Sequence, residues 1–436
     1  MSLGVDLGTT NSVVALSRQR QVDILPLGPM RSGLIPSLLT AQGQPLPFLQ
    51  PGCFHDFKRD MEMPDEEISP GVTPKMLTTA LCRYLYQEIA QSLGNPVERI
   101  VLTVPARFSD RARKATRDAA KAAGFQVIRL LNEPTAAALA YGLQQKQDGI
   151  FLVYDLGGGT FDATLLRLQG DVFQILATSG DLFLGGRTLD QAIVRWWGKD
   201  SSDPEVLRRA CQLKESFADP TLTFEELPRE VFDGLVNDLL EETISLVRTM
   251  LAEAHVRSEE VQGVVLVGGS TRLPHVVSRL ENLFGAEKIY KTLDPDRAVA
   301  IGAALHAEAL TNMSPQERPL LLDVVPASLG LETAMGIVEN IIPRYTPTPI
   351  QTTVQFSTMV DNQTEVLIHV LQGDSLQKEG CVSLGKFALR GIPPMPKGQP
   401  KINVTFCVNE DGILTVKAEE LLSGTKQHVI LEEFLG

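Results

Sequence analysis

The stretch VYDLGGGTFDATLL, residues 153–166, places three consecutive glycines between two aspartates, Asp155 and Asp162. A similar stretch, LGVDLGTTNSVVAL, begins at Leu3 and carries Asp6 in the place of Asp155. In each, an apolar strand and an aspartate lead into a turn of small residues and a second, largely apolar strand. One such turn is typical of any β-hairpin, but its repetition predicts two related α/β lobes that face each other.

The two turns also indicate a phosphate site. Glycines allow a close backbone approach, so successive N–H groups can point into a hollow that binds anions. Carboxylates would repel a phosphate unless a divalent cation lies between them, and Mg²⁺ prefers one or two carboxylates with waters and phosphate oxygens. Asp6 and Asp155 therefore predict a bound magnesium nucleotide. These glycines join strand to strand, unlike those of the Walker and Rossmann motifs, which lead from strand to helix.

The composition is that of a globular protein and excludes several classes. The 436 residues are 43% apolar and 21% charged, and their number predicts about three domain-sized units. A net charge of −13 argues against nucleic acid as the main partner. The lack of a long apolar run or a signal sequence predicts a cytoplasmic protein. The five cysteines and six histidines are scattered, which predicts neither a disulfide framework nor a structural metal site.

Strands and helices alternate over the first part of the chain, which predicts an α/β sheet. The helix of residues 73–94 has Thr73 as its N-cap and Gly94 past its end. Strands are predicted at residues 99–108 and 126–134, and a similar series follows residue 150. From about Pro319 the pattern changes to short runs with period two, which predicts an all-β module. The domains expected are 1–314, a linker at 315–325, and 326–436.

Six motifs occur in the order found in the 70 kDa heat-shock (DnaK-type) chaperones, and the chain resembles this family over its whole length. The resemblance implies an α/β actin-like ATPase domain of two pseudo-repeated lobes, followed by an all-β sandwich that binds peptides. Within the family, PASLGLET and KFALRGIPPMPKG look closest to the HscA branch, which serves iron–sulfur scaffold proteins. The motifs are DLGTTNS at Asp6, NEPTAAALAYG at Asn132, DLGGGTFD at Asp155, LGG at Leu184, VVLVGGSTRLP at Val264 and DPDRAVAIGAA at Asp294.

The function implied is that of an ATP-dependent chaperone that binds extended client segments under nucleotide control. It would hydrolyse ATP slowly to ADP with Mg²⁺, stimulated by a J-domain co-chaperone. The client would be a hydrophobic or proline-containing peptide, such as a segment of an iron–sulfur scaffold protein, and neither nucleic acid nor membrane is expected. The alternative is a nucleotide-responsive adaptor with little refolding activity. Sugar kinases of the same superfamily are disfavoured by the β-sandwich.

Site residues follow from the motifs that match the family. Lys58 in DFKRDM would be the catalytic lysine, or else an ordinary surface lysine. Lys214 would contact adenosine, or else face solvent on its helix. The other catalytic residues implied are Glu133, Asp155, Thr160 and Asp162. The nucleotide-binding residues implied are Asp6, Gly8, Thr9, Thr10, Asn11, Gly157, Gly158, Gly159, Gly185, Gly186, Gly268, Gly269, Ser270, Arg272 and Asp296, with Asp6 and Asp155 holding Mg²⁺ through its waters.

Two further groups of residues are implied by the resemblance. The residues that would couple the domains are Pro105, Arg113, Arg129, Asn132, Thr135, Leu320, Leu321, Leu322 and Asp323. The peptide-binding residues would be Leu331, Phe356, Val366 and Ile368, with Ala334 and Met359 forming an arch over the peptide. Any one of the four pocket residues could instead belong to the sandwich core. The arch is reversed, because Ala334 takes the place of a methionine and Met359 that of an alanine.

Two departures from the family pattern affect the expected activity. Only about fifteen residues separate Lys58 from the helix at Thr73, and residues 190–228 are also compressed, so both lobes are shortened and contacts for a nucleotide-exchange factor are expected to be missing. The chain stops at Gly436, where the sandwich ends, so a helical lid is expected to be absent. Without a lid, we expect weak and rapidly exchanging peptide binding in both nucleotide states.

Overall fold

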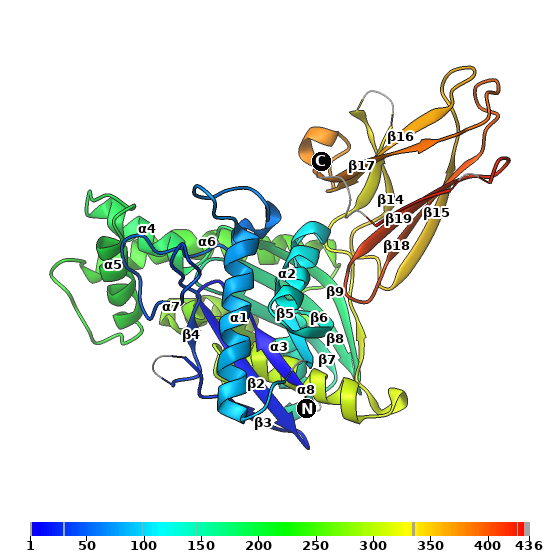
Figure 1. The fold of residues 1–436 in the computed structure, drawn as a ribbon. Coiled ribbons are helices and arrows are strands. Elements are labelled where there is room, and N and C mark those ends of the chain that lie inside the picture. Colours follow the sequence, from blue (N-terminus) through cyan, green and yellow to red (C-terminus); the bar gives the residue numbers. More distant parts are fainter. Residues whose placement is uncertain are drawn as a thin grey trace. The chain divides into compact units, whose positions relative to one another are not determined.

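The computed structural model describes residues 2–28, 31–97, 99–145, 147–333, 336–424 and 426–430. The chain divides into two compact units, shown in Figure 1. The first contains Met1–Phe108 and Lys114–Leu321, and the second contains Ser109–Arg113 and Leu322–Gly436. The division after Leu321 lies inside the predicted linker. No helix in the described ranges is long and apolar enough to span a membrane.

The first unit is built on two sheets with the same strand pattern, which confirms the predicted pair of related lobes. In each sheet a glycine turn joins two antiparallel strands, and parallel strands extend the sheet on the other side. The first sheet runs β3 (Gln21–Ile24), β2 (Asn11–Arg18), β1 (Leu3–Asp6), β5 (Arg99–Val104) and β6 (Gln126–Asn132), with β4 (Ile35–Pro36) paired to β2. The second runs β11 (Ile289–Tyr290), β10 (Val261–Val267), β7 (Gly149–Leu156), β8 (Phe161–Gln169), β9 (Val172–Asp181) and β12 (Leu320–Leu322).

Helices follow the strands, and two of them pack closely at the join between the lobes. The α-helices are α1 (Pro74–Leu93), α2 (Asp110–Ala122), α3 (Glu133–Gln145), α4 (Gly186–Trp196), α5 (Pro204–Ser216), α6 (Arg229–Glu253), α7 (Pro274–Phe284) and α8 (Ala298–Asn312). A Cβ atom on Gly302 of α8 would lie 1.7 Å from the carbonyl oxygen of Ala136 in α3. The two helices can approach this closely only because residue 302 lacks a side chain.

Local chemistry fixes both ends of α1 and is compatible with the start of α3. The Thr73 hydroxyl accepts a hydrogen bond from the Met76 N–H at 3.2 Å, and Gly94 ends the helix at φ 70°, so the predicted helix is confirmed. The predicted strand 126–134 is too long, because α3 already begins at Glu133. Pro134 is compatible with this start, since the first turn of a helix does not need its N–H group.

The second unit contains two four-stranded antiparallel sheets, as expected of a β-sandwich. One runs β14 (Val338–Ile342), β13 (Leu329–Glu332), β16 (Glu365–Gln372) and β17 (Val382–Arg390). The other runs β15 (Ile350–Phe356), β18 (Ile402–Val408), β19 (Leu414–Glu420) and β20 (Lys426–Ile430). Residues of both sheets, among them Val370, Phe387 and Phe406, form one buried apolar cluster. The alternation seen in the sequence is therefore a true inside–outside pattern.

Candidate functional site

The glycine turns of both lobes border one cavity of about 440 Å³, a volume in the range of small-molecule sites. Most of the predicted catalytic and nucleotide-binding residues line it. They are Asp6, Gly8, Thr9, Thr10, Asn11, Glu133, Asp155, Gly157, Gly158, Thr160, Lys214, Gly268, Gly269, Ser270, Arg272 and Asp296. The other predicted residues of this group lie outside the lining, namely Lys58, Gly159, Asp162, Gly185 and Gly186.

The two turns touch each other at the cavity wall. A Cβ atom on Gly158 would lie 1.9 Å from the Thr10 hydroxyl oxygen, so the turns pack without room for a side chain at this point. Ser37 holds the first turn from behind. Its N–H donates to the Thr10 carbonyl at 2.8 Å, and its hydroxyl donates to the Gly8 carbonyl at 2.7 Å. Hydrogen bonds thus fix the shape of the turn independently of any ligand.

The second turn is held in place by the start of α4. The N–H groups of Gly186 and Arg187 donate to the carbonyls of Gly157 and Gly158 at 3.0 and 2.6 Å. The Ser270 hydroxyl also donates to the Gly157 carbonyl, at 2.9 Å. Gly185 therefore lies behind the turn, where it supports the cavity wall.

Substitution of Gly185 by alanine is expected to weaken ATP binding by roughly 10-fold or more. A Cβ atom there would lie 2.7 Å from Gly159 C and 2.8 Å from Thr160 N, so the turn would have to shift. Titration calorimetry with ATP and Mg²⁺ measures the effect. Gly234→Ala is the matched control, since a Cβ atom at position 234 meets nothing within 4 Å. Equal affinity of the two variants would show that the turn does not contact the nucleotide.

A cluster of carboxylates lies at the bottom of the cavity. Burial raises the pKa of Asp6 to about 7, with a further contribution from the charge of Glu133. Burial also raises the pKa of Asp155 well above its usual value, with added repulsion from Glu133 and Asp162. The Thr103 hydroxyl donates to Asp6 at 3.0 Å, and its role was not visible in the sequence. So many acids in a small space indicate a site that needs a cation.

The donor set fits a hard divalent cation such as Mg²⁺. Asp6 and Asp155 offer carboxylate oxygens, which Mg²⁺ prefers, and the ion usually keeps several of its waters. In the part of the chain that the structure describes, no three or more Asp, Glu, His or Cys side chains could together hold a metal ion. Contact of Asp6 and Asp155 with the ion through its waters stays a prediction.

Lys58 is the counterion of this acidic cluster. Its ammonium nitrogen donates to Glu133 Oε1 at 2.5 Å, and both side chains are buried. The alternative of an ordinary surface lysine is therefore wrong, because Lys58 is only 5% exposed. Lys58 comes directly before the 3₁₀ helix Arg59–Glu62, and Glu133 begins α3. The pair thus joins two distant segments of the chain beside the cavity.

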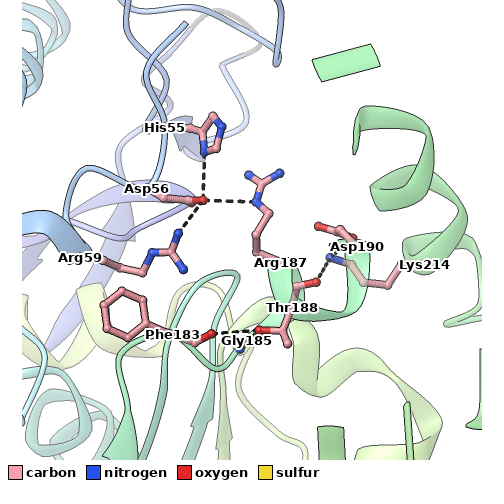
Figure 2. Close-up of polar contacts among 10 residues, drawn as sticks. His55, Asp56, Arg59, Phe183, Gly185, Arg187, Thr188, Asp190 and Lys214 are labelled. Atoms are coloured by element: carbon pink, nitrogen blue, oxygen red, sulfur yellow. Dashed lines mark hydrogen bonds and ion pairs between the residues drawn. The ribbon is translucent and has the colours of Figure 1, made fainter. Parts of the chain in front are cut away.

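The other end of the cavity is lined by α5 and by the loop before α8. Lys214 Nζ lies 2.8 Å from Asp190 Oδ1 and donates to the Gly186 carbonyl at 3.1 Å (Figure 2). Burial opposes its charge, but Asp190 outweighs this and the pKa of Lys214 is raised. Lys214 is therefore buried, and the alternative prediction that it faces solvent on its helix is wrong. Arg272 binds Asp296 at 2.7 Å and Asp294 at 2.5 Å.

Several lining residues were missed from the sequence, among them Arg187 and Asp190. Arg187 also binds Asp56 Oδ2 through Nε at 3.3 Å. Neither residue lies in a motif that was assigned to the site, although Arg187 directly follows the short motif LGG. A signal was nevertheless present, since Asp190 is an acid in the apolar-faced helix that follows LGG.

The residues predicted to couple the domains lie on three segments. Pro105 follows β5, and Arg113 is in the first turn of α2. Arg129, Asn132 and Thr135 lie on β6 and the start of α3, the segment that also carries Glu133. Leu320, Leu321 and Leu322 form β12, and Asp323 follows it. The Leu320 N–H donates to the Asp171 carbonyl at 2.9 Å, which pairs the start of β12 with the second sheet.

The predicted peptide-binding residues differ in their burial. Leu331 and Ile368 belong to the buried core of the sandwich, and Phe356 and Val366 pack against that core while remaining partly exposed. Met359 is 67% exposed, as an arch residue would need to be, and Ala334 lies outside the described residues. Their role in peptide binding stays a prediction.

Comparisons with known proteins agree with these features. The sequence model described as Hsp70 protein matches residues 58–212 and 211–434. A protein named chaperone protein HscA homolog from Acidithiobacillus ferrooxidans (strain ATCC 53993 / BNL-5-31) is 43% identical over 384 residues, which cover 84% of this chain and 62% of the relative. The chain thus spans less than two thirds of that relative's length.

Two relatives of the same name align with the whole of this chain. The one from Pseudomonas paraeruginosa is 40% identical over 486 residues, covering 78% of its own length. The one from Aliivibrio fischeri (strain MJ11) is 38% identical over 487 residues, covering 79%. Both alignments are longer than the 436 residues of this chain, so the relatives contain stretches that it lacks.

Proposed function

Because the chain belongs to the Hsp70 protein family, with HscA-like proteins among its relatives, we propose that it is an ATP-dependent chaperone. Its first unit binds and hydrolyses ATP, and its second unit binds extended segments of client proteins. The observation that carries this proposal is the cavity between the two glycine turns, with its acidic cluster and Lys58. Phosphoryl transfer needs this kind of positioning and charge compensation more than covalent chemistry.

The residues around the cavity have separate roles in hydrolysis. Backbone N–H groups of the two turns bind the β- and γ-phosphates, and each hydrogen bond to a charged group is worth roughly 1.5–3 kcal/mol. Glu133, held by Lys58 at 2.5 Å, orients the attacking water. Thr160 and Asp162 lie on the same hairpin as Asp155 and complete the reacting end. Asp155 and Asp162 lie directly opposite each other across that hairpin.

Asp6 and Asp155 are the residues that would hold Mg²⁺ through its waters. The ion would neutralise charge on the phosphate oxygens when it is bound. At the other end, Lys214 and Arg272 line the wall against which the adenosine would lie. The ionic partners of these two side chains hold them in place before any ligand arrives.

The β12 segment is the element through which the nucleotide would control peptide binding. Leu320 and Leu321 pair with the second sheet of the first unit, and Leu320 is 52% exposed. A segment with so little buried side-chain surface can detach at low cost. Its attachment is thus an equilibrium that both the nucleotide and the client could bias.

The client and the co-chaperone follow from the HscA-like character of the chain. We propose a J-domain protein that acts on the segment of Arg129, Asn132 and Thr135, and a hydrophobic or proline-containing client segment from an iron–sulfur scaffold protein. A cytoplasmic location is part of the same proposal.

Turnover of ATP, with and without a J-protein and a proline-rich scaffold peptide, tests this function. We expect slow basal hydrolysis that increases when both partners are added. Binding of ATP without turnover under any condition would instead support a nucleotide-responsive adaptor. No binding of ATP at all would rule out both.

A further inference from the structure

A compact cluster of charges lies beside the phosphate turn of the second lobe and has no part in the roles assigned so far. Its centre is the carboxylate of Asp56, which is 4% exposed. Oδ2 of Asp56 lies 2.9 Å from His55 Nδ1, 3.0 Å from Arg59 Nη2 and 3.3 Å from Arg187 Nε (Figure 2). One carboxylate thus joins a segment of the first lobe to the start of α4 in the second.

Two arginines share the Asp56 carboxylate. Arg59 and Arg187 are always protonated, and Asp56 supplies a single negative charge between them. Burial opposes ionisation of Asp56, but His55, Arg187 and Arg59 together lower its pKa, so the carboxylate stays charged. Asp60 lies near Arg59 and offsets part of its charge, so Arg187 is the guanidinium group that a further anion would compensate.

Arg187 is in the first turn of α4, next to the phosphate turn. The Arg187 N–H donates to the carbonyl of Gly158, a residue of the phosphate turn, at 2.6 Å. Arg187 lines the cavity, and its side chain is 13% exposed. On the other side, the Arg59 Cδ atom would lie 3.3 Å from a Cβ atom on Gly159. The side chain of Arg59 and the backbone of Arg187 therefore both lie next to the turn.

The orientation of Arg187 leaves part of its guanidinium group available. Only Nε of Arg187 is joined to Asp56 in Figure 2. The two Nη atoms are the ones that form paired hydrogen bonds to phosphate oxygens most readily. Asp56 thus fixes the plane of the group without occupying its outer edge.

We propose that Arg187, oriented by Asp56, binds the terminal phosphate of ATP and makes the site selective for the triphosphate. This rests on the proposed function, since it assumes that the cavity binds ATP. A positive charge fixed at the end of the phosphate chain stabilises charge there with no need to reorganise. ADP, which lacks the terminal phosphate, would gain less from the same arginine.

The test compares affinities for three ligands in the presence of Mg²⁺, namely the β,γ-imido analogue of ATP, ADP and adenosine. Titration calorimetry is performed on the full chain and on Arg187→Gln. We expect the substitution to weaken the ATP analogue roughly 10- to 100-fold, ADP by less than about threefold, and adenosine not at all. Arg195→Gln, at an exposed position of the same helix, is the matched control and should behave as the unmodified chain.

A purely structural role of Arg187 would give a different pattern. If Arg187 served only to neutralise Asp56, its loss would weaken all three ligands together, and Asp56→Asn in the same chain would restore them. Weaker binding of all three ligands, recovery in the double variant, or an unchanged affinity for the analogue would each overturn the proposal for Arg187. None of these results would affect the ATP site itself. Failure of the unmodified chain to bind the analogue would instead refute the proposed function itself. A selective loss for the analogue that persists in the double variant supports the phosphate contact.

Discussion

Replacing Lys58 by glutamine is expected to lower kcat for ATP hydrolysis by about 100- to 1000-fold, with a much smaller change in the Kd for ATP. The reason is the position of Lys58, whose ammonium group lies 2.5 Å from Glu133 and lowers the cost of ionising Asp6. Without it, Glu133 loses its orientation and its negative charge opposes the approach of the phosphates. Single-turnover hydrolysis, measured beside ATP binding, separates the two effects.

Loss of a buried cation also affects stability, and the controls take account of this. Removing one partner of a buried ion pair costs about 3–5 kcal/mol, so thermal unfolding must show that the variant is folded at the assay temperature. Lys58→Gln combined with Glu133→Gln removes the uncompensated charge and should recover stability without recovering turnover. Lys75→Gln is the surface control, since the ammonium group of Lys75 lies 3.7 Å from Asp65 and both are exposed. Turnover of Lys58→Gln within about threefold of that control would exclude a catalytic role for Lys58.

Substituting His306 by glutamine is expected to make the protein more resistant to acid. Burial lowers the pKa of His306 from 6.5 to about 3, with added repulsion from Arg129 and Arg318. Below pH 6.5 the unfolded chain therefore binds a proton at this position that the folded chain excludes. Stability falls as the pH decreases from 6.5 towards 3, and at pH 4.5 this one residue accounts for about 2–3 kcal/mol of the loss.

Chemical denaturation at pH 7 and pH 4.5 measures this effect. The free energy of unfolding should fall less on acidification for His306→Gln than for the unmodified chain. Neither ring nitrogen of His306 has a hydrogen-bond partner among the described residues, so the amide of glutamine breaks no observed bond. His255→Asn is the control, because His255 is exposed. Asparagine is chosen because the backbone at residue 255 has a φ of 54°, which asparagine tolerates better than most residues. An equal loss of unfolding free energy between pH 7 and pH 4.5 in the two variants would show that the pKa of His306 is not lowered in the folded chain.

Much of the fold could be predicted because its signals are local. Caps such as Thr73 and Gly94 depend on neighbouring backbone groups, and both lie where the sequence placed them. The two glycine turns were recognisable because each is a complete hairpin within one short stretch. The start of α3 was misplaced, since the apolar run before Glu133 gives no sign of where the strand ends.

The parts of the site that could not be predicted depend on contacts between distant segments. Lys214 is buried because Asp190, on another helix, lies 2.8 Å away, and nothing near Lys214 in the sequence shows this. Asp56 and Arg187 likewise meet only in the folded chain. For Leu331 and Ile368, alternation predicted a buried face but could not distinguish a peptide pocket from the sandwich core, where both are found.

The pairing of Leu320 with Asp171 has a consequence for solubility. The start of β12 covers the outer edge of β9 in the second sheet, and an uncovered edge strand is a template for pairing with another chain. If this segment detaches as proposed, the part of β9 (Val172–Asp181) that it covers becomes open to strand addition. The chain would then be most prone to aggregate in the nucleotide state that releases β12, so light scattering would report detachment without any label.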